Sequence, residues 1–288
     1  MTRRLLVVLA TLLLVDCANL QLFVANVASS AGPYILTHNI AYGREPRQKL
    51  DIYHPEDKPG AATQAQLPVV VFFHGGRWSE DSKDDYRFVG ATLAEHGWLG
   101  IVPSYRLYPK VKFPAFVEDA ALAVAWVQQH AAAYGGDPRR LFVMGHSAGA
   151  HLALLIALDR RYLAAVGSTA SAIRGAIGLS GPYDFLPYPT DYIKGVFAGA
   201  ADPLDTQPIH FARADAPPIL LVHGGADEMV ATQNSISLAA ALERLGGDVT
   251  LKIYQGGSHG DTVAGFSNLR REGPPVLDDV ARFIAAHP

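Results

Sequence analysis

Short apolar runs alternate with helix-patterned segments along most of this chain, and that alternation constrains the fold more than any other feature. The run at 67–73 is continuous and rich in valine and phenylalanine, as expected of a strand buried on both faces. Further strands are predicted at 99–104, 141–144, 173–179, 218–222 and 249–254. Apolar residues at helical spacing predict helices at 84–96, 116–130, 148–158, 233–245 and 275–286. Strands separated by helices indicate an α/β fold with a mostly parallel sheet and helices on both faces.

The body of the chain, residues 32–288, is predicted to form one domain. With 49% hydrophobic and 18% charged residues among 288, it can bury a sizeable core. Segments 34–42 and 48–54 indicate an antiparallel strand pair. Residues 181–216 are rich in proline, tyrosine and aspartate and lack periodicity, which is typical of a lid-like insertion. The net charge of −3, without a basic block, argues against nucleic acid as a partner.

Residues 1–31 are predicted to be a separate targeting segment. Two arginines precede an apolar run at 5–15, a pattern typical of an export signal, and small residues at 28–31 offer cleavage sites. The stretch 5–28 is also long enough to span a bilayer, although Asp16 at its centre is costly there. We therefore favour a cleaved signal over a membrane anchor. We expect an exported protein, periplasmic or secreted, with membrane association through this segment as the alternative.

Cys17 is the only cysteine, so no disulfide can form within the chain. Residues 14–17 resemble a bacterial lipoprotein cleavage box, but Asp16 stands where that box has a small residue. A lipid anchor is therefore the lesser alternative. A catalytic cysteine is not expected either, because Cys17 lies in the targeting segment.

The pentapeptide Gly-His-Ser-Ala-Gly at 145–149 is the strongest chemical signal in the chain. It follows a short apolar strand and opens a helix, which is the context that a Gly-x-Ser-x-Gly nucleophile elbow requires. Side chains at the two glycines would collide with the neighbouring strand and helix. The helix N-terminus favours negative charge beside the serine. An ordinary helix-capping serine is the alternative interpretation, but the context favours Ser147 as a nucleophile.

The segment His-Gly-Gly-Arg-Trp at 74–78 directly follows the strand at 67–73. Glycines let backbone N–H groups approach a developing oxyanion closely, so we predict Gly75 and Gly76 as oxyanion donors together with the N–H of Ala148. A simple β-turn is the alternative. A second His-Gly-Gly at 223–225 follows the nucleophile strand rather than preceding it, and so lies in the wrong place for this role.

A serine hydroxyl needs a neutral imidazole to take its proton, and the imidazole needs a carboxylate behind it. His259 and Asp227 each follow a predicted strand, and the order serine, acid, histidine suits this class of fold. We predict them as base and acid, with Asp184 as the alternative acid. His146 and His151 are five residues apart and there is no cysteine cluster, so no metal site is expected.

Taken together, these motifs resemble the carboxylesterase-type α/β hydrolases near the hormone-sensitive-lipase and feruloyl-esterase-like branches. The resemblance begins near residue 48 and runs to the C-terminus. The motifs that carry it are His-Gly-Gly-Arg-Trp at 74–78, Ser-Tyr-Arg-Leu at 104–107, Phe-Pro-Ala at 113–115, Glu-Asp at 118–119, Gly-Gly-Asp-Pro at 135–138, the segment 145–152, Asp227 and His259. One residue departs from the lipase branch: Arg77 replaces the third glycine after the histidine, as in the feruloyl-esterase, kynurenine-formamidase and prenylcysteine-methylesterase relatives.

The resemblance implies an α/β-hydrolase fold with an eight-stranded sheet, no cofactor, and hydrolysis of carboxylic esters. We therefore expect a serine carboxylesterase for small-molecule esters, short-chain or aryl, that works through an acyl-enzyme. Trp78 and Tyr183 are predicted to contact the substrate. One alternative is an amidase for N-formyl aromatic substrates, with an aromatic pocket that adds Phe185 and Tyr188. A catalytically inactive binding protein on the same fold is the other. The oligomeric state is not indicated.

Overall fold

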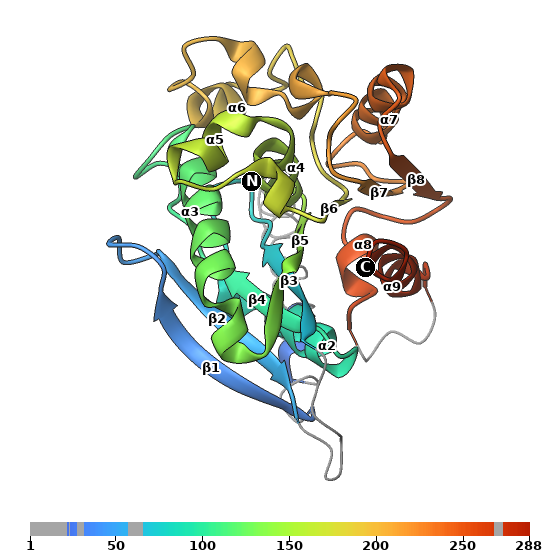
Figure 1. Cartoon of the computed structure of the whole chain (residues 1–288). Helices are drawn as coiled ribbons and strands as arrows, with labels where there is room; N and C mark the ends of the chain where they lie inside the picture. Colours follow the sequence, from blue (N-terminus) through green and yellow to red (C-terminus); the bar gives the residue numbers. More distant parts are fainter. Residues whose placement is uncertain (1–21, 23, 28–31, 57–65, 268–272) are drawn as a thin grey trace, which may run out of the picture.

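The protein forms an α/β-hydrolase fold built on one eight-stranded sheet, as expected (Figure 1). The computed structural model describes residues 22, 24–27, 32–56, 66–267 and 273–288. The strands are β1 Tyr34–Ala41, β2 Lys49–Pro55, β3 Leu67–Phe73, β4 Leu99–Pro103, β5 Gly136–His146, β6 Gly175–Leu179, β7 Ile219–Gly224 and β8 Val249–Tyr254. Their order across the sheet is β1-β2-β4-β3-β5-β6-β7-β8.

The direction of the strands fixes where a functional site can lie. β2 runs antiparallel to both β1 and β4, whereas every pairing from β4 through β8 is parallel. The carboxyl ends of the parallel strands therefore meet at one edge of the sheet, which is where open α/β sheets carry their sites.

Helices cover both faces of the sheet (Figure 1). They are α2 Arg87–Glu95, α3 Ala115–His130, α4 Ala148–Leu158, α5 Arg160–Ala165, α6 Asp191–Val196, α7 Gln233–Leu245, α8 Asp261–Ala264 and α9 Val276–Ala286. Alternate residues of β3 serve the two faces: Val71 and Phe73 pack with α3 and α4, while Val70 and Phe72 pack with α2 and α9. This double burial explains why the strand is apolar throughout.

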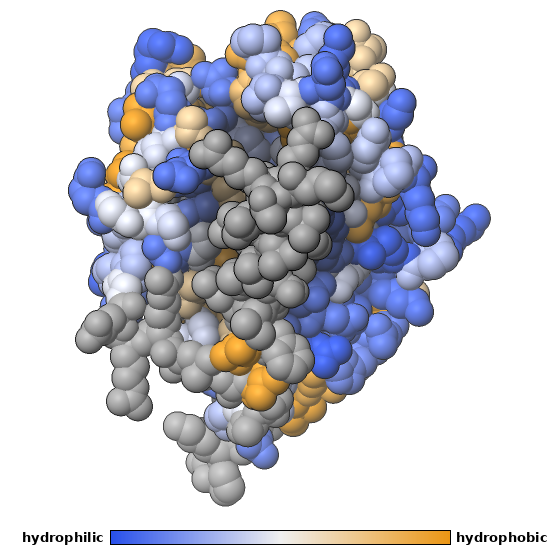
Figure 2. Space-filling view, turned by 180° about the vertical axis from the view of Figure 1, so that it is seen from behind, coloured by the Kyte–Doolittle hydropathy of each residue, from blue (hydrophilic) through white to orange (hydrophobic). Residues whose placement is uncertain are grey.

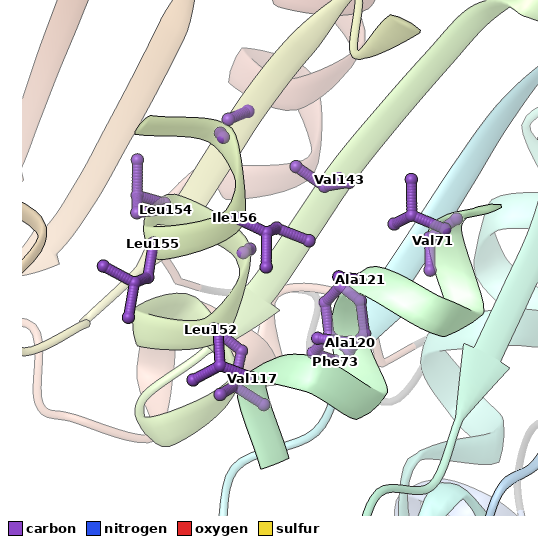
Figure 3. Close-up of a cluster of buried hydrophobic side chains, with 14 of the residues drawn as sticks. Val71, Phe73, Val117, Ala120, Ala121, Val143, Leu152, Leu154, Leu155 and Ile156 are labelled. Atoms are coloured by element: carbon purple, nitrogen blue, oxygen red, sulfur yellow. The ribbon is translucent and has the colours of Figure 1, made fainter. Parts of the chain in front are cut away.

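Helix α4 is the centre of the larger core (Figure 3). All of its residues are buried, and Leu152, Leu155 and Ile156 pack among side chains of α3 and the sheet. A helix that is apolar all round belongs inside a protein. The buried helix thus fixes the position of its own N-terminus, which follows Ser147.

The opposite side of the molecule presents mainly hydrophilic side chains with hydrophobic ones in small groups (Figure 2).

Two element boundaries differ from the predictions by three residues or more. The helix expected at 84–96 begins as a 3-10 turn at Lys83–Tyr86 and becomes α-helical only at Arg87. Strand β5 begins at Gly136 rather than near residue 141, with an irregular register against β3 between Leu67 and Val69. Glycine and proline in this stretch resemble a turn, so the sequence pattern does not reveal the early pairing.

Residues 24–27 are helical and contact the domain, earlier in the chain than the boundary expected after residue 31. Ala25 is buried in the core beside α2. The Asn26 side chain donates to the carbonyls of Asp84 and Asp85 and accepts from the N–H of Phe88. It therefore satisfies a free amide in the first turn of α2. Apart from residue 22, the rest of the predicted targeting segment lies outside the described residues. No helix in the described ranges combines the length and hydrophobicity that a bilayer crossing requires.

Candidate active site

Ser147 lies in a strained turn between β5 and α4. Its backbone has φ 54° and ψ −120°, a conformation that side-chain-bearing residues rarely adopt and that costs about 1–3 kcal/mol. The Ser147 N–H is fixed by the Leu179 carbonyl of the neighbouring strand at 2.8 Å. Such a backbone turns the side chain away from both the strand and the helix.

The two flanking glycines are required by close backbone contacts, as predicted. A Cβ on Gly145 would lie 2.2 Å from the carbonyl oxygen of Gly149. A Cβ on Gly149 would lie 2.0 Å from the carbonyl oxygen of Phe73 and 2.4 Å from that of His74. The start of α4 is therefore pressed directly against the end of β3, next to the His-Gly-Gly segment.

Asp227 and His259 are joined directly. The Nδ1–H of His259 donates to Oδ2 of Asp227 at 2.7 Å, and the Asp227 side chain is fully buried. Burial would raise the pKa of Asp227, but hydrogen bonds from His223 and His259 outweigh it and hold that pKa well below its ordinary value. The amides of Met229 and Val230 also donate to Asp227 Oδ1, each at 2.9 Å. The carboxylate is thus ionised and fixed behind the imidazole.

The His259 loop is held beside the nucleophile turn by contacts that the sequence did not reveal. The Nε2–H of His146 donates to the His259 carbonyl at 3.1 Å, and the two imidazole centroids are 4.8 Å apart. Thr262 donates its hydroxyl to the same carbonyl at 3.1 Å. Since His146 immediately precedes Ser147, His259 is brought next to the elbow. Ser147 and His259 both lie in the described part of the chain, and their side chains are not hydrogen-bonded to each other. In unliganded enzymes such a bond is commonly long, and it shortens when substrate binds.

The buried imidazole of His146 is uncharged at neutral pH. Burial and the neighbouring His259 lower its pKa to about 3. Its Nδ1 is buried without a partner in the described chain. A neutral ring here acts as a single donor, so it positions the His259 backbone without adding positive charge to the site.

The His-Gly-Gly segment lies against the elbow. A Cβ on Gly75 would come 3.2 Å from Nδ1 of His146, and one on Gly76, which has φ +93°, would come 2.4 Å from the Glu80 carbonyl. Among the described residues, the N–H groups of Gly75, Gly76, Arg77 and Ala148 form no hydrogen bond to another backbone group. The three predicted oxyanion donors are therefore all available, and the Arg77 amide is a donor that the sequence did not single out.

The prediction that Trp78 and Tyr183 contact substrate is corrected by their burial. Tyr183 is completely buried, and its hydroxyl fills the space left open by Gly178 and Gly181. Trp78 is 4% exposed and packs edge-on against Phe197, with centroids 4.9 Å apart. Both side chains are parts of the core. They support the wall of the site rather than present a surface to substrate.

The alternatives for the acid and for a metal find no support in the geometry. Asp184 is exposed, and its backbone amide binds Asn234. His223 bonds to Ser235 and to the Val230 carbonyl, which makes it a support of the Asp227 loop. Within the described ranges, no cluster of three or more histidine, cysteine or acidic side chains is placed to hold a metal ion.

The fold defines an α/β hydrolase, and its carboxyl edge brings the loops of Ser147, Asp227 and His259 together. Residues 50–242 match the BD-FAE family, and the chain belongs to that family. This range contains the His-Gly-Gly segment, the elbow and Asp227, and it ends before His259.

Two curated relatives and one solved structure illustrate the similarity. The chain is 29% identical over 269 residues to an isoprenylcysteine alpha-carbonyl methylesterase of Arabidopsis thaliana, covering 86% of this chain and 62% of the relative. It is 30% identical over 233 residues to the esterase LipQ of Mycobacterium tuberculosis, covering 73% and 53%. The chain thus spans less than two thirds of these relatives. The apo form of esterase 2 from Thermogutta terrifontis superposes with a TM-score of 0.72 at 26% identity, covering 88% and 94%.

Proposed function

We propose that this protein is a serine carboxylesterase that hydrolyses small-molecule carboxylic esters through an acyl-enzyme. The observation that carries the proposal is the His259–Asp227 pair held beside the strained Ser147 turn. Curated relatives bear the names of esterases and of a carboxylic ester hydrolase, which supports the same reaction.

The proposed reaction uses the residues in two half-steps. Ser147 Oγ attacks the ester carbonyl while His259 Nε2 takes the hydroxyl proton, and Asp227 holds the opposite N–H of the ring. Amides of Gly76 and Ala148 stabilise the negative oxygen of the tetrahedral intermediate. His259 then gives its proton to the leaving alcohol. In the second half-step water attacks the acyl-enzyme, with His259 again as base, and the acid is released.

We infer that the acyl group is short. Phe185, Phe197 and Trp78 pack around His151 on α4, one turn beyond Ser147, so that aromatic side chains fill the space beside this turn of the helix. The burial of Trp78 and Tyr183 weakens the aromatic pocket of the formamidase alternative, of which Phe185 and Tyr188 are the partly exposed members.

The test compares Ser147→Ala with wild type on p-nitrophenyl acetate, butyrate and octanoate. We expect wild type to prefer acetate or butyrate, and the variant to lose at least about 1,000-fold in kcat. Ser171→Ala is the matched control, because Ser171 is an exposed serine in a turn before β6, away from the carboxyl edge. Equal turnover by wild type and Ser147→Ala would refute the proposal.

A further inference from the structure

Arg77 is the residue of the His-Gly-Gly-Arg-Trp segment to which the proposed reaction gives no side-chain role. Three successive residues of this loop, Gly76, Arg77 and Trp78, have positive φ values of 93°, 53° and 61°. Strain of this kind persists where the surroundings fix it, and it clusters at functional sites. Here it sends consecutive side chains in opposite directions: Trp78 is buried, and Arg77 is exposed.

The exposed guanidinium is held in place by an aromatic face. It lies over the ring of Tyr192, 4.7 Å from the centroid. Tyr192 belongs to α6 in the insertion, and its hydroxyl donates to the hydroxyl of Ser79 in the loop of Arg77. Tyr108 packs edge-on against the Tyr192 ring, with centroids 5.7 Å apart. A guanidinium stacked in this way keeps its N–H edges free for an anion.

No carboxylate in the part of the chain that the structure describes takes that position. Within the described residues, no carboxylate forms an ion pair with Arg77. The acidic residues that follow Arg77 in the loop are Glu80 and Asp81, and Asp81 faces inward, where the Tyr86 hydroxyl donates to it at 3.4 Å. An oriented, uncompensated arginine one residue beyond the oxyanion glycine Gly76 is therefore available to a group on the substrate.

We propose that Arg77 and Tyr192 form a subsite for a carboxylate carried by the ester substrate. The planar fork of an arginine matches a carboxylate with two parallel hydrogen bonds, which is the best geometry for recognising this group. The inference rests on the proposed ester hydrolysis and adds the substrate class: esters with a free carboxylate on the acyl or the alcohol part. In this proposal the side chain of Arg77 determines which esters are preferred. The backbone N–H of Arg77 takes no part in binding the carboxylate.

Two matched substrate pairs test the subsite. 4-Acetoxybenzoate and its neutral methyl ester place the carboxylate on the leaving side. Mono-4-nitrophenyl glutarate and 4-nitrophenyl valerate place it on the acyl side. We expect wild type to favour the anionic member of one pair in kcat/KM. We expect Arg77→Gln to lower that anionic-to-neutral ratio about tenfold or more, with Arg77→Lys intermediate.

Arg174→Gln is the matched control, because Arg174 is an exposed arginine before β6, at the opposite edge of the sheet. It removes the same charge, so an equal change of the ratio in Arg174→Gln would assign the effect to net charge and overturn the subsite. An Arg77→Gln ratio equal to wild type for both pairs would overturn it as well. Turnover of the neutral esters by wild type tests the hydrolase activity separately, so failure of the two proposals can be told apart.

Discussion

Asp227 shows how one side chain can hold both its own loop and the imidazole of His259 in place. Its Oδ1 receives two backbone amides of its own loop, and its Oδ2 receives His259 while His223 lies 3.2 Å away. The two oxygens thus have distinct duties: one shapes the turn and the other orients the imidazole. This division explains why a buried carboxylate, usually costly, is ionised here.

Replacing Asp227 by asparagine removes the charge and one of the two acceptor oxygens. With its oxygen kept on the amides of Met229 and Val230, the side-chain NH₂ faces His259 and cannot accept the Nδ1–H of the ring. The imidazole is then held in the wrong tautomer, so we expect Asp227→Asn to lower kcat about 10⁴-fold on p-nitrophenyl acetate. Asp184→Asn is the matched control, since Asp184 is exposed and away from His259 in the hydrogen-bond network. A larger loss for Asp184→Asn than for Asp227→Asn would reverse the assignment of the acid.

At the scale of elements, the nucleophile turn depends on how closely α4 approaches β3. The contacts that Gly149 makes possible are with backbone oxygens of Phe73 and His74, which cannot swing aside as a side chain can. The helix is buried along its whole length, so it cannot move outward either. The position and the backbone strain of Ser147 are therefore set by packing contacts that extend well beyond the turn itself.

We expect Gly149→Ala to lower the free energy of unfolding by about 3 kcal/mol or more, because its Cβ would lie 2.0 Å from the Phe73 oxygen. Gly260→Ala is the comparison, since Gly260 has an ordinary φ of −74° and open space around its Cβ. That change should leave stability equal or slightly higher. Urea unfolding of both variants checks this, and a Gly149→Ala protein as stable as wild type would show that α4 can shift.

At the scale of the whole molecule, buried neutral histidines make the free energy of unfolding depend on pH. Burial lowers the pKa of His74 to about 3 and that of His151 to about 4, and burial together with His259 lowers that of His146 to about 3. As the pH falls below the ordinary histidine pKa, these three side chains become protonated in the unfolded chain but stay neutral in the folded protein. The unfolded state then binds more protons than the folded state, so the free energy of unfolding decreases as the pH drops.

This loss begins near the ordinary histidine pKa of 6.5 and continues toward the lowered values. Each of these residues contributes up to about 1.4 kcal/mol per pH unit in that window. The depressed pKa of Asp227 adds a loss in the same direction only below about pH 4. Urea midpoints measured at pH 7, 6 and 5 should decline steadily. A midpoint independent of pH over this range would contradict the neutral assignment.

Much of the fold and of the site could be predicted because the evidence for it is local. Continuous apolar runs such as that of β3 report double burial, and the glycines around Ser147 report backbone contacts. What the sequence did not reveal depends on distant segments meeting. Tyr183 was expected at substrate because it is an aromatic residue in the insertion, yet Gly178 and Gly181 open a space for it in the core. The contact of His146 with the His259 carbonyl joins two loops that only the folded sheet brings together.

The hydrogen bonds of Asn26 to α2 would make the stability of that helix depend on where the N-terminal segment is cleaved. Trimming at 28–31, where the sequence offers cleavage sites, would remove the side chain that accepts from Phe88, and that amide would have to turn to water. A protein that keeps residue 26 would hold its second helix more firmly than one that begins at residue 32. If the chain is cleaved as the sequence predicts, the position of the cut would then decide how stable the first turn of α2 is in the product.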